Sequence, residues 1–517
     1  MIGDAPPRVG GLGRVTGQQA YLADLPMDDV LHVKLVSLDV ARARIHAIDT
    51  SAALAVPGVR MVMTAADLPH PIRRFGPQFR DRPVLAEGET HFHGEPIAAV
   101  AAETLDAAEG AATLVRVDFE ELPAVFTVDG ALSPDAPLVQ DPELRPGDPL
   151  ARTNVLREHR YGWGDIDAAA AAEPDLTVVE GTYTFPMVTQ FAIEPHGFAA
   201  APDGDGMAIW STIQHPNWLQ RVIADVLDLP LAKVRVFAPD PGGGFGGKQH
   251  AKYEPLIACL ARATGRPVRL ILTLEETFQA VRRGASQVRV RTGFRRDGSI
   301  VFRDIEANYL IGAYADIADR TVGKGSYTAG GPYRNPALRI VARSVLSHTT
   351  PSTAFRGFGN PQQIWSVESN MDEAAELLGI DPLELRLRNL ASPGDAFIPG
   401  DTPADGDWAV TVRKAAEMIG WSESRARAPG RGRGIAIGLK SGPTTGLSHS
   451  IVRMLADGSA VVYAGTSDMG QGARTIFAQI AAQELGIPID WVSVVMGDTA
   501  VVPYDQQTSA SRSTVLM

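Results

Sequence analysis

The chain has almost no cysteine: one residue, Cys259, in 517. A single cysteine excludes a disulfide framework, a four-cysteine zinc site and any iron–sulfur cluster carried by this chain alone. Cys259 lies in the apolar run 257–260, which is typical of a helix core, and we expect it to be a buried small hydrophobe. If the chemistry is redox, the electron relay must therefore lie on another chain.

The chain has fewer basic residues than acidic ones, 48 Lys and Arg against 60 Asp and Glu, which gives a formal net charge of −12 and a pI near 5.4. This balance argues against nucleic acid or an anionic membrane as the main partner. Apolar runs approaching the ~18 residues that span a bilayer are absent. The first residues lack the charged and apolar regions of a secretory signal. We expect a soluble, cytoplasmic protein with no membrane span.

At 517 residues the chain is long enough for several domains. Two stretches rich in proline, glycine and aspartate predict a linker over 131–149 and a connector over 392–432. They separate residues 1–130, which mix short strands with Ala-rich helices, from a long α+β region over 150–391. Residues 433–517 follow the connector.

Glycine is concentrated at 242–249, which reads Gly-Gly-Gly-Phe-Gly-Gly-Lys-Gln. So many glycines leave backbone N–H groups uncovered and allow a large anionic ligand to approach closely. Gly242, Gly244 and Gly247 also fit G-x-G-x-x-G after the apolar run 234–238. That match keeps an NAD-dependent oxidoreductase open as an alternative, although no βαβ start precedes it.

One strand-loop-helix unit occurs twice. Gln214 precedes a predicted helix and strand over 217–238, and Gln471 precedes a predicted helix and strand over 473–496. Both glutamines stand just before a helix N-terminus, where free N–H groups and the dipole favour an anion. The repeat predicts two related lobes that present equivalent loops to one ligand between them.

A third glycine-rich loop, 353–362, holds Arg356 between aromatic residues. A guanidinium fork in such a place suits a carboxylate, a phosphate or a polar heterocycle. The apolar periodicity after the loop predicts a helix that ends at Gly379. Asp381 is the predicted N-cap of a further helix, and that helix carries Arg388.

Together these loops resemble the molybdenum-cofactor-binding (large) subunit of the xanthine dehydrogenase/aldehyde oxidase family. The resemblance implies an α+β chain with an N-terminal α/β-hammerhead domain followed by a two-lobed molybdopterin-binding domain. Residues 1–130 would form the hammerhead domain, 150–391 the first lobe, and 433–517 the start of an incomplete second lobe. The matching segments, in the family's order, are 14–17, 93–96, 242–248, 353–359, 469–472 and 508–514.

The resemblance also implies site residues. No side chain binds the metal, because the pterin dithiolene holds it. Arg356 would orient the substrate, and Gln249 takes the place of a glutamate that purine-oxidising members use on the substrate. Lys440 and Ser441 fall in the substrate pocket, where Lys440 would meet a substrate carboxylate. The residues expected to line the cofactor are Gln214, Gly244, Phe245, Gly246, Arg388, Gly470, Gln471, Gly472 and Ala510.

The implied activity is hydroxylation of an aromatic N-heterocycle or aldehyde, with water as the oxygen source. The implied cofactor is molybdopterin, and its cytosine dinucleotide form is left open. Electrons would pass to [2Fe–2S] clusters on a partner subunit, which agrees with the single cysteine. Whether a further partner carries FAD is also left open.

The chain departs from the family in two ways. The family's catalytic glutamate lies in a Gly-Glu-Pro context beyond the Ala510 loop, whereas the only Gly-Glu-Pro here is 94–96, in the hammerhead region. We therefore expect either a fragment or a split subunit that a second chain completes, inactive without the missing segment. A non-catalytic pterin-binding or assembly protein is the other alternative. Gln249 and Lys440 also weaken the case for xanthine, and Gly357 weakens the case for carbon monoxide.

Overall fold

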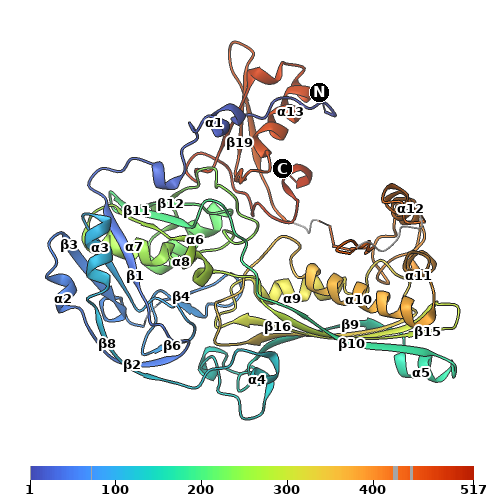
Figure 1. Cartoon of the computed structure of the whole chain (residues 1–517). Helices are drawn as coiled ribbons and strands as arrows, with labels where there is room; N and C mark the ends of the chain where they lie inside the picture. The colour runs from blue at the N-terminus through green and yellow to red at the C-terminus, as the bar shows by residue number, and fades with distance from the viewer. Residues whose placement is uncertain (1, 72, 423–428, 443–445, 517) are drawn as a thin grey trace.

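The computed structural model describes residues 2–71, 73–422, 429–442 and 446–516. Figure 1 shows a large body with the first strands in blue, a long sheet beneath helices, and a smaller unit in red. In the described part of the chain, no helix is long and apolar enough to cross a membrane.

A seven-stranded sheet forms the large body. β1 lies next to its central strand, β14, with which it pairs in parallel, Leu31 standing opposite Val268, and β1 pairs antiparallel with β7 on its other side. The first 130 residues and the region after 150 therefore share one sheet. Its strand order is β13 (Val234–Phe237), β12 (Gly206–Ser211), β11 (Gly197–Asp203), β14 (Val268–Ile271), β1 (Leu31–Val36), β7 (Ala98–Ala102) and β3 (Val59–Thr64).

Two helices, α6 (Pro216–Leu227) and α7 (Glu254–Thr264), add their apolar faces to the core of this sheet. Cys259 lies in α7 within that core, as predicted. Burial raises the pKa of its thiol to about 12, so the thiol stays protonated and unreactive at neutral pH.

The second sheet has five strands, and Figure 1 shows helices α9 and α10 lying along one of its faces. β16 has 13 residues, which corresponds to roughly 40 Å of extended chain. The strand order is β10 (Thr177–Phe185), β15 (Ser286–Phe294), β16 (Ile300–Gly312), β17 (Ala337–Leu346) and β9 (Val155–Trp163), and the helices are α9 (Ala318–Tyr327) and α10 (Asn360–Leu378).

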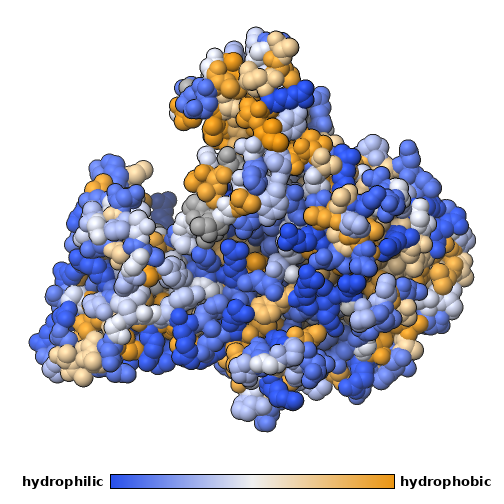
Figure 2. All heavy atoms as spheres, turned by 180° about the vertical axis from the view of Figure 1, so that it is seen from behind, coloured by the Kyte–Doolittle hydropathy of each residue, from blue (hydrophilic) through white to orange (hydrophobic). Residues whose placement is uncertain are grey.

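The smaller unit is a three-stranded sheet, β18 (Ser450–Met454), β19 (Ala460–Ala464) and β20 (Val492–Met496), with helix α13 (Ala473–Leu485). All five residues of β18 are exposed, among them Ile451, Val452 and Met454. Figure 2 shows apolar residues gathered over this unit. The N-terminal segment lies beside α13 (Figure 1), where the Ile2 N–H donates to Gln483 Oε1 at 2.8 Å.

The predicted repeat is confirmed. β12, α6 and β13 form a parallel β-α-β unit, and β19, α13 and β20 form a second one. The two units meet at the ends of β13 and β20, because the Ala238 N–H donates to Gly497 O at 2.6 Å. The loops that carry Gln214 and Gln471 therefore belong to equivalent positions of two adjoining lobes.

The local helix predictions are also confirmed. α10 ends at Gly379, which has φ of 65°, and the Asp381 side chain caps the next helix, α11 (Pro382–Asn389). The other elements are short and connect or flank the sheets. They are α1 (Gly11–Val15), α2 (Ser51–Leu54), α3 (Leu105–Ala112), α4 (Val128–Leu132), α5 (Ile166–Ala171), α8 (Leu274–Ala280), α12 (Trp408–Met418), α14 (Ser513–Leu516), β2 (Ala43–Asp49), β4 (Arg74–Phe75), β5 (Arg82–Pro83), β6 (Glu89–Thr90) and β8 (Arg116–Glu121).

Candidate functional site between the two lobes

The glycine loop 242–249 lies between the lobes and leaves no room for larger residues. A Cβ on Gly246, whose φ is 105°, would stand 2.6 Å from Ala354 O. A Cβ on Gly244 would stand 2.5 Å from Gln214 Oε1 and 2.6 Å from Met469 Sδ, one from each lobe. Only glycine allows this close approach, so the loop is held in a fixed shape.

Gln214 links the glycine loop to the second lobe. Its side chain is buried, with 2% of the residue exposed. Oε1 accepts the Gly246 N–H at 2.9 Å, and Nε2 donates to Thr508 O at 3.0 Å. Because both the oxygen and the nitrogen of the amide are bonded, this one side chain holds three predicted segments together: its own loop, the glycine loop and the segment around Thr508.

Glu194 and Lys248, which are not among the predicted site residues, brace the same loop. Glu194 Oε2 accepts the Gly242 N–H at 2.7 Å and lies 3.0 Å from Lys248 Nζ. Burial lowers the pKa of Lys248, while Glu194 opposes that shift. The ion pair therefore joins the two ends of the loop. Lys248, at the end of the glycine run, is a sequence signal for this ion pair.

Gln249 makes a second contact between the lobes. It is buried, and its Nε2 donates to Gln507 Oε1 at 2.8 Å. Ala510 follows closely in the same segment, with φ of 54°. The Thr508 N–H donates to Gln214 O at 3.2 Å, which brings this segment against the first lobe. Gln249 and Ala510 therefore both belong to the junction between the lobes.

The Arg356 loop closes another side of the site. The Arg356 N–H donates to Phe245 O at 2.9 Å. Phe245, at φ of 52°, keeps 41% of its surface exposed. The Arg356 side chain is also exposed, and among the described residues it makes no hydrogen bond or ion pair. An aromatic ring and an uncompensated cation therefore stand free at this junction.

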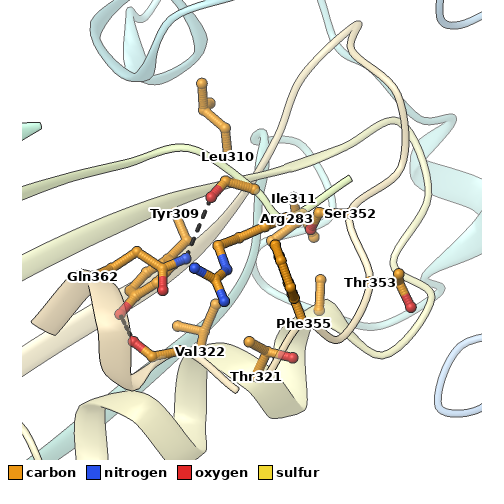
Figure 3. Close-up of a pocket in the computed structure, with 13 residues that line it drawn as sticks. Arg283, Tyr309, Leu310, Ile311, Thr321, Val322, Ser352, Thr353, Phe355 and Gln362 are labelled. Carbon is orange, nitrogen blue, oxygen red and sulfur yellow. Dashed lines mark hydrogen bonds between the residues drawn. The ribbon is translucent and has the colours of Figure 1, made fainter. Parts of the chain in front are cut away.

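A buried arginine supports the Arg356 loop from below. Arg283 Nη2 donates to Arg356 O at 2.6 Å, and its guanidinium lies 4.2 Å from the centroid of the Phe355 ring. Figure 3 shows this ring beside the guanidinium in a small cavity, which Gln362 also lines. Burial lowers the pKa of Arg283 to about 10, so it remains charged at neutral pH.

The second lobe contributes the loop before α13. Gln471 Oε1 accepts the Met469 N–H at 2.8 Å, and Gln471 Nε2 donates to Ser467 O at 3.0 Å. Gly470 and Gly472 have φ of 108° and 85°, and Gly472 is the N-cap of α13. A cleft of about 360 Å³ opens at this helix start, lined by residues that include Arg8, Gln471, Thr475 and Thr514.

The structure places the remaining predicted residues differently. Arg388 lies beside Gly298, at the far end of the five-stranded sheet, and is not brought to the site. The reason is that α10 has 19 residues, about 28 Å of helix, and carries the chain away from Arg356.

Lys440 and Ser441 lie near the start of α10, where Asn360 Nδ2 donates to Leu439 O at 3.3 Å. Lys440 is exposed, and its Nζ donates to Ser441 O. Burial of its stem and repulsion from Lys324 lower the pKa of Lys440. Residues 443–445, which follow directly, lie outside the described residues.

The dinucleotide alternative does not match the geometry. In a Rossmann unit a helix opens at the glycine loop and leads to a parallel strand. Here Gly247 lies in a turn, and α7 begins only at Glu254. The following strand, β14, pairs antiparallel with β11 instead of parallel with β13. The glycine loop therefore faces the second lobe, not a helix N-terminus.

Comparison with known proteins identifies this arrangement. Residues 16–123 match the family model described as aldehyde oxidase and xanthine dehydrogenase, a/b hammerhead domain. Residues 149–390 and 414–517 match two models described as molybdopterin cofactor-binding domain. The chain belongs to the molybdenum-binding subunits of the xanthine dehydrogenase/aldehyde oxidase family. The fold class predicted from the sequence, a hammerhead domain followed by molybdopterin-binding lobes, is confirmed.

Individual relatives of this family match most of the chain. The xanthine dehydrogenase molybdenum-binding subunit of Escherichia coli O157:H7 is 31% identical over 530 residues, which are 98% of this chain and 69% of that protein. The nicotinate dehydrogenase large molybdopterin subunit of Eubacterium barkeri is 31% identical over 82% of this chain and 99% of its own length. The aldehyde oxidoreductase structure from Desulfovibrio desulfuricans aligns with a TM-score of 0.89 and 28% identity, over 99% of this chain and 58% of that one.

Proposed function

We propose that this chain is a molybdenum hydroxylase subunit. Its reaction would insert water-derived oxygen at an electron-poor carbon of an aromatic N-heterocycle or aldehyde. The supporting observation is the interlobe junction, where the Gln214 amide joins the glycine loop to the 508–510 segment. Around it lie positive-φ backbone, an exposed phenylalanine ring and the exposed Arg356, which has no counter-charge among the residues that the structure describes.

These features fit an anionic pterin. Gly244 and Gly246 hold the loop in a shape that a side chain would disrupt, because a Cβ there would collide with Gln214 Oε1 or Ala354 O. A glycine loop fixed in this way can present its backbone to phosphate and pterin oxygens. We propose that Gln214, Gly244, Phe245 and Gly246 hold one side of the cofactor. Gly470, Gln471, Gly472 and Ala510 would hold the other side. The cleft at the start of α13 has room for a nucleotide extension, and the helix dipole favours its phosphates.

When bound, the cofactor supplies a metal centre that activates water and accepts an electron pair. The residues of this chain would position the reactants. We propose that Phe245 excludes water from one side, that Arg356 orients the substrate, and that Gln249 contacts its polar edge. Lys440, with Ser441 beside it, would meet a substrate carboxylate, which favours an acid of the nicotinate type.

We propose that the electrons leave through groups outside the residues of this sequence. Cys259 is buried and its thiol is protonated at neutral pH, so it cannot ligate a cluster. We propose a partner subunit that carries [2Fe–2S] clusters, and an FAD subunit as a further partner.

We also propose that additional polypeptide, in the same chain or a second one, covers β18 and supplies the general base. β18 presents Ile451, Val452 and Met454 to solvent, with 52%, 49% and 48% of their surfaces exposed. Trp491 and Leu447, elsewhere in the same lobe, are also exposed. An unpaired edge strand with apolar side chains is a ready site for strand addition.

Metal analysis of the chain, purified with its partner subunits, tests the main proposal. We expect molybdenum in stoichiometric amount, together with a fluorescent pterin after oxidative release. Bound NAD without molybdenum would overturn it.

Substrate profiling of the same preparation tests the pocket. Lys440→Ala is expected to raise KM for nicotinate about tenfold, the effect of losing one charge-assisted contact, while KM for an uncharged aldehyde stays the same. Arg339→Ala, an exposed residue on β17, is the matched control. An unchanged KM for nicotinate would remove Lys440 from the substrate site.

A further inference from the structure

The N-terminal segment reaches across the molecule to the second lobe. Besides the contact from Ile2, the Val9 N–H donates to Thr475 Oγ1 in α13 at 2.9 Å. Figure 1 shows the N-terminus and α1 beside α13, away from the strands that follow them in sequence. This segment therefore packs on residues that are 466 positions away along the chain.

Arg8 contacts the loop that carries Gln471. Its Nη1 donates to Gly470 O at 2.9 Å, and its Nη2 lies 3.2 Å from Asp468 Oδ1. The Asp468 side chain is 1% exposed. Its carboxylate accepts the N–H groups of Gly470, Gly472 and Arg474, at 3.0, 3.3 and 3.2 Å. Asp468 thus folds this loop onto the start of α13, and Arg8 supplies the charge that balances it.

Arg14 makes the corresponding contact in the first lobe. Its Nη2 lies 2.9 Å from Asp240 Oδ2, just before the glycine loop. Asp240 is also bonded by Arg474, whose Nε and Nη2 lie 3.1 and 2.8 Å from its two oxygens. Arg474 belongs to α13, so Asp240 joins the two lobes, and Arg14 adds a second cation to it.

We propose that residues 8–14 form a clasp that holds the two cofactor loops in register. Arg8 fixes the loop before α13 through Asp468, and Arg14 fixes the glycine loop through Asp240. Both are positioning residues, because they act on backbone loops and not on the reacting atoms. This proposal rests on the proposed function for its consequence, namely cofactor retention, but the clasp itself is a property of the chain.

The loss of Arg8 raises the free energy of the buried Asp468 carboxylate. Removing Arg8 leaves a buried carboxylate with backbone donors but no cation, and such a loss weakens a charge-assisted network. The loop then opens more often, and Gln471 loses its fixed position. Arg14 has a smaller effect, because Asp240 keeps Arg474 as a partner.

The test compares Arg8→Met, Arg8→Lys and Arg14→Met in the full chain with its partner subunits. Arg44→Met is the matched control, since Arg44 forms an exposed pair with Glu120 on the far side of the hammerhead region. In cofactor-free protein, hydrogen exchange of amides 470–475 is expected to quicken about tenfold in Arg8→Met and less in Arg8→Lys. In the loaded protein, molybdenum should dissociate about tenfold faster in Arg8→Met than in the control.

The outcomes separate the two proposals. Unchanged exchange at 470–475 in Arg8→Met would overturn the clasp, whatever the metal content. Faster exchange with unchanged molybdenum dissociation would show that the clasp does not position the cofactor loops. Absence of molybdenum from the unmutated protein would instead refute the proposed function, while the exchange measurement would still decide the clasp. Where Arg8→Met does not fold, Arg8→Lys and Arg8→Gln provide the same comparison, because both leave the Asp468 carboxylate and its bonds to Gly470, Gly472 and Arg474 in place.

Discussion

Single buried polar side chains decide the geometry of this site. Gln214 satisfies a backbone N–H in one lobe and a backbone carbonyl in the other, which no apolar or acidic residue of that size can do. The position of Gln214 before a helix marks it in the sequence, but nothing there indicates the Thr508 contact. That partner lies 294 residues away and leaves no local pattern.

Replacing Gln214 with leucine should destabilise the protein by about 3 kcal/mol, because two buried backbone groups lose their partner. Urea unfolding of the cofactor-free chain measures this, and metal analysis should show less bound molybdenum. The exposed Gln18→Leu is the control. Equal stability of the two variants would contradict the bridging role.

Asp81 should make stability depend on pH. Burial raises its pKa to about 6, although the Ala315 N–H and Gln140 Nε2 donate to its Oδ2. Because the folded pKa lies above the unfolded one, its contribution to stability is complete below about pH 4 and is lost as the pH rises through about 6.

Comparing the protein with Asp81→Asn between pH 4 and 7 isolates this effect. The difference in unfolding free energy should change by about 3 kcal/mol, with the unmutated protein becoming less stable relative to the variant as pH rises. A difference that is independent of pH would show that Asp81 keeps an ordinary pKa in the folded state.

At the level of elements, local signals were predicted well and long-range placement was not. The helix over Asn360–Leu378, its end at Gly379 and the cap at Asp381 all follow from spacing and capping chemistry within a few residues. Arg388 shows the limit of such local prediction. Helix α10 was predicted correctly, but it leads the chain away from the site before Arg388 is reached in α11. Periodicity gives the face of a helix but not the direction in which it leads.

Asp381→Ala should cost about 1 kcal/mol, the usual loss of an N-cap. Its carboxylate accepts the N–H groups of Leu383 and Glu384 and also the Trp421 indole N–H. Thermal unfolding measures the loss, with the exposed Asp118→Ala as control. No change relative to that control would mean that α11 is held by packing alone.

For the whole molecule, the main surprise is the shared sheet. The sequence predicts residues 1–130 as one domain followed by a linker, yet β1 pairs with β14 on the far side of that linker. Strand pairing between distant segments depends on matching edges, which composition and turn signals do not reveal.

A fragment of residues 1–130 should therefore not fold alone, because β1 would expose the edge that β14 covers. Far-ultraviolet circular dichroism and amide dispersion in NMR are expected to show an unfolded or aggregated chain. Co-expression with residues 131–517 should restore a soluble complex. A folded, monomeric fragment would show that the β1–β14 contact is dispensable.

The clasp has a consequence for the order of events during synthesis. Arg8 leaves the ribosome early, but Asp468 is made 460 residues later, roughly half a minute or more at ordinary translation rates. The first lobe can thus form its sheets while the N-terminal arm has no partner. The clasp can close only after the loop before α13 has been made, so an arm that is synthesised first is docked late.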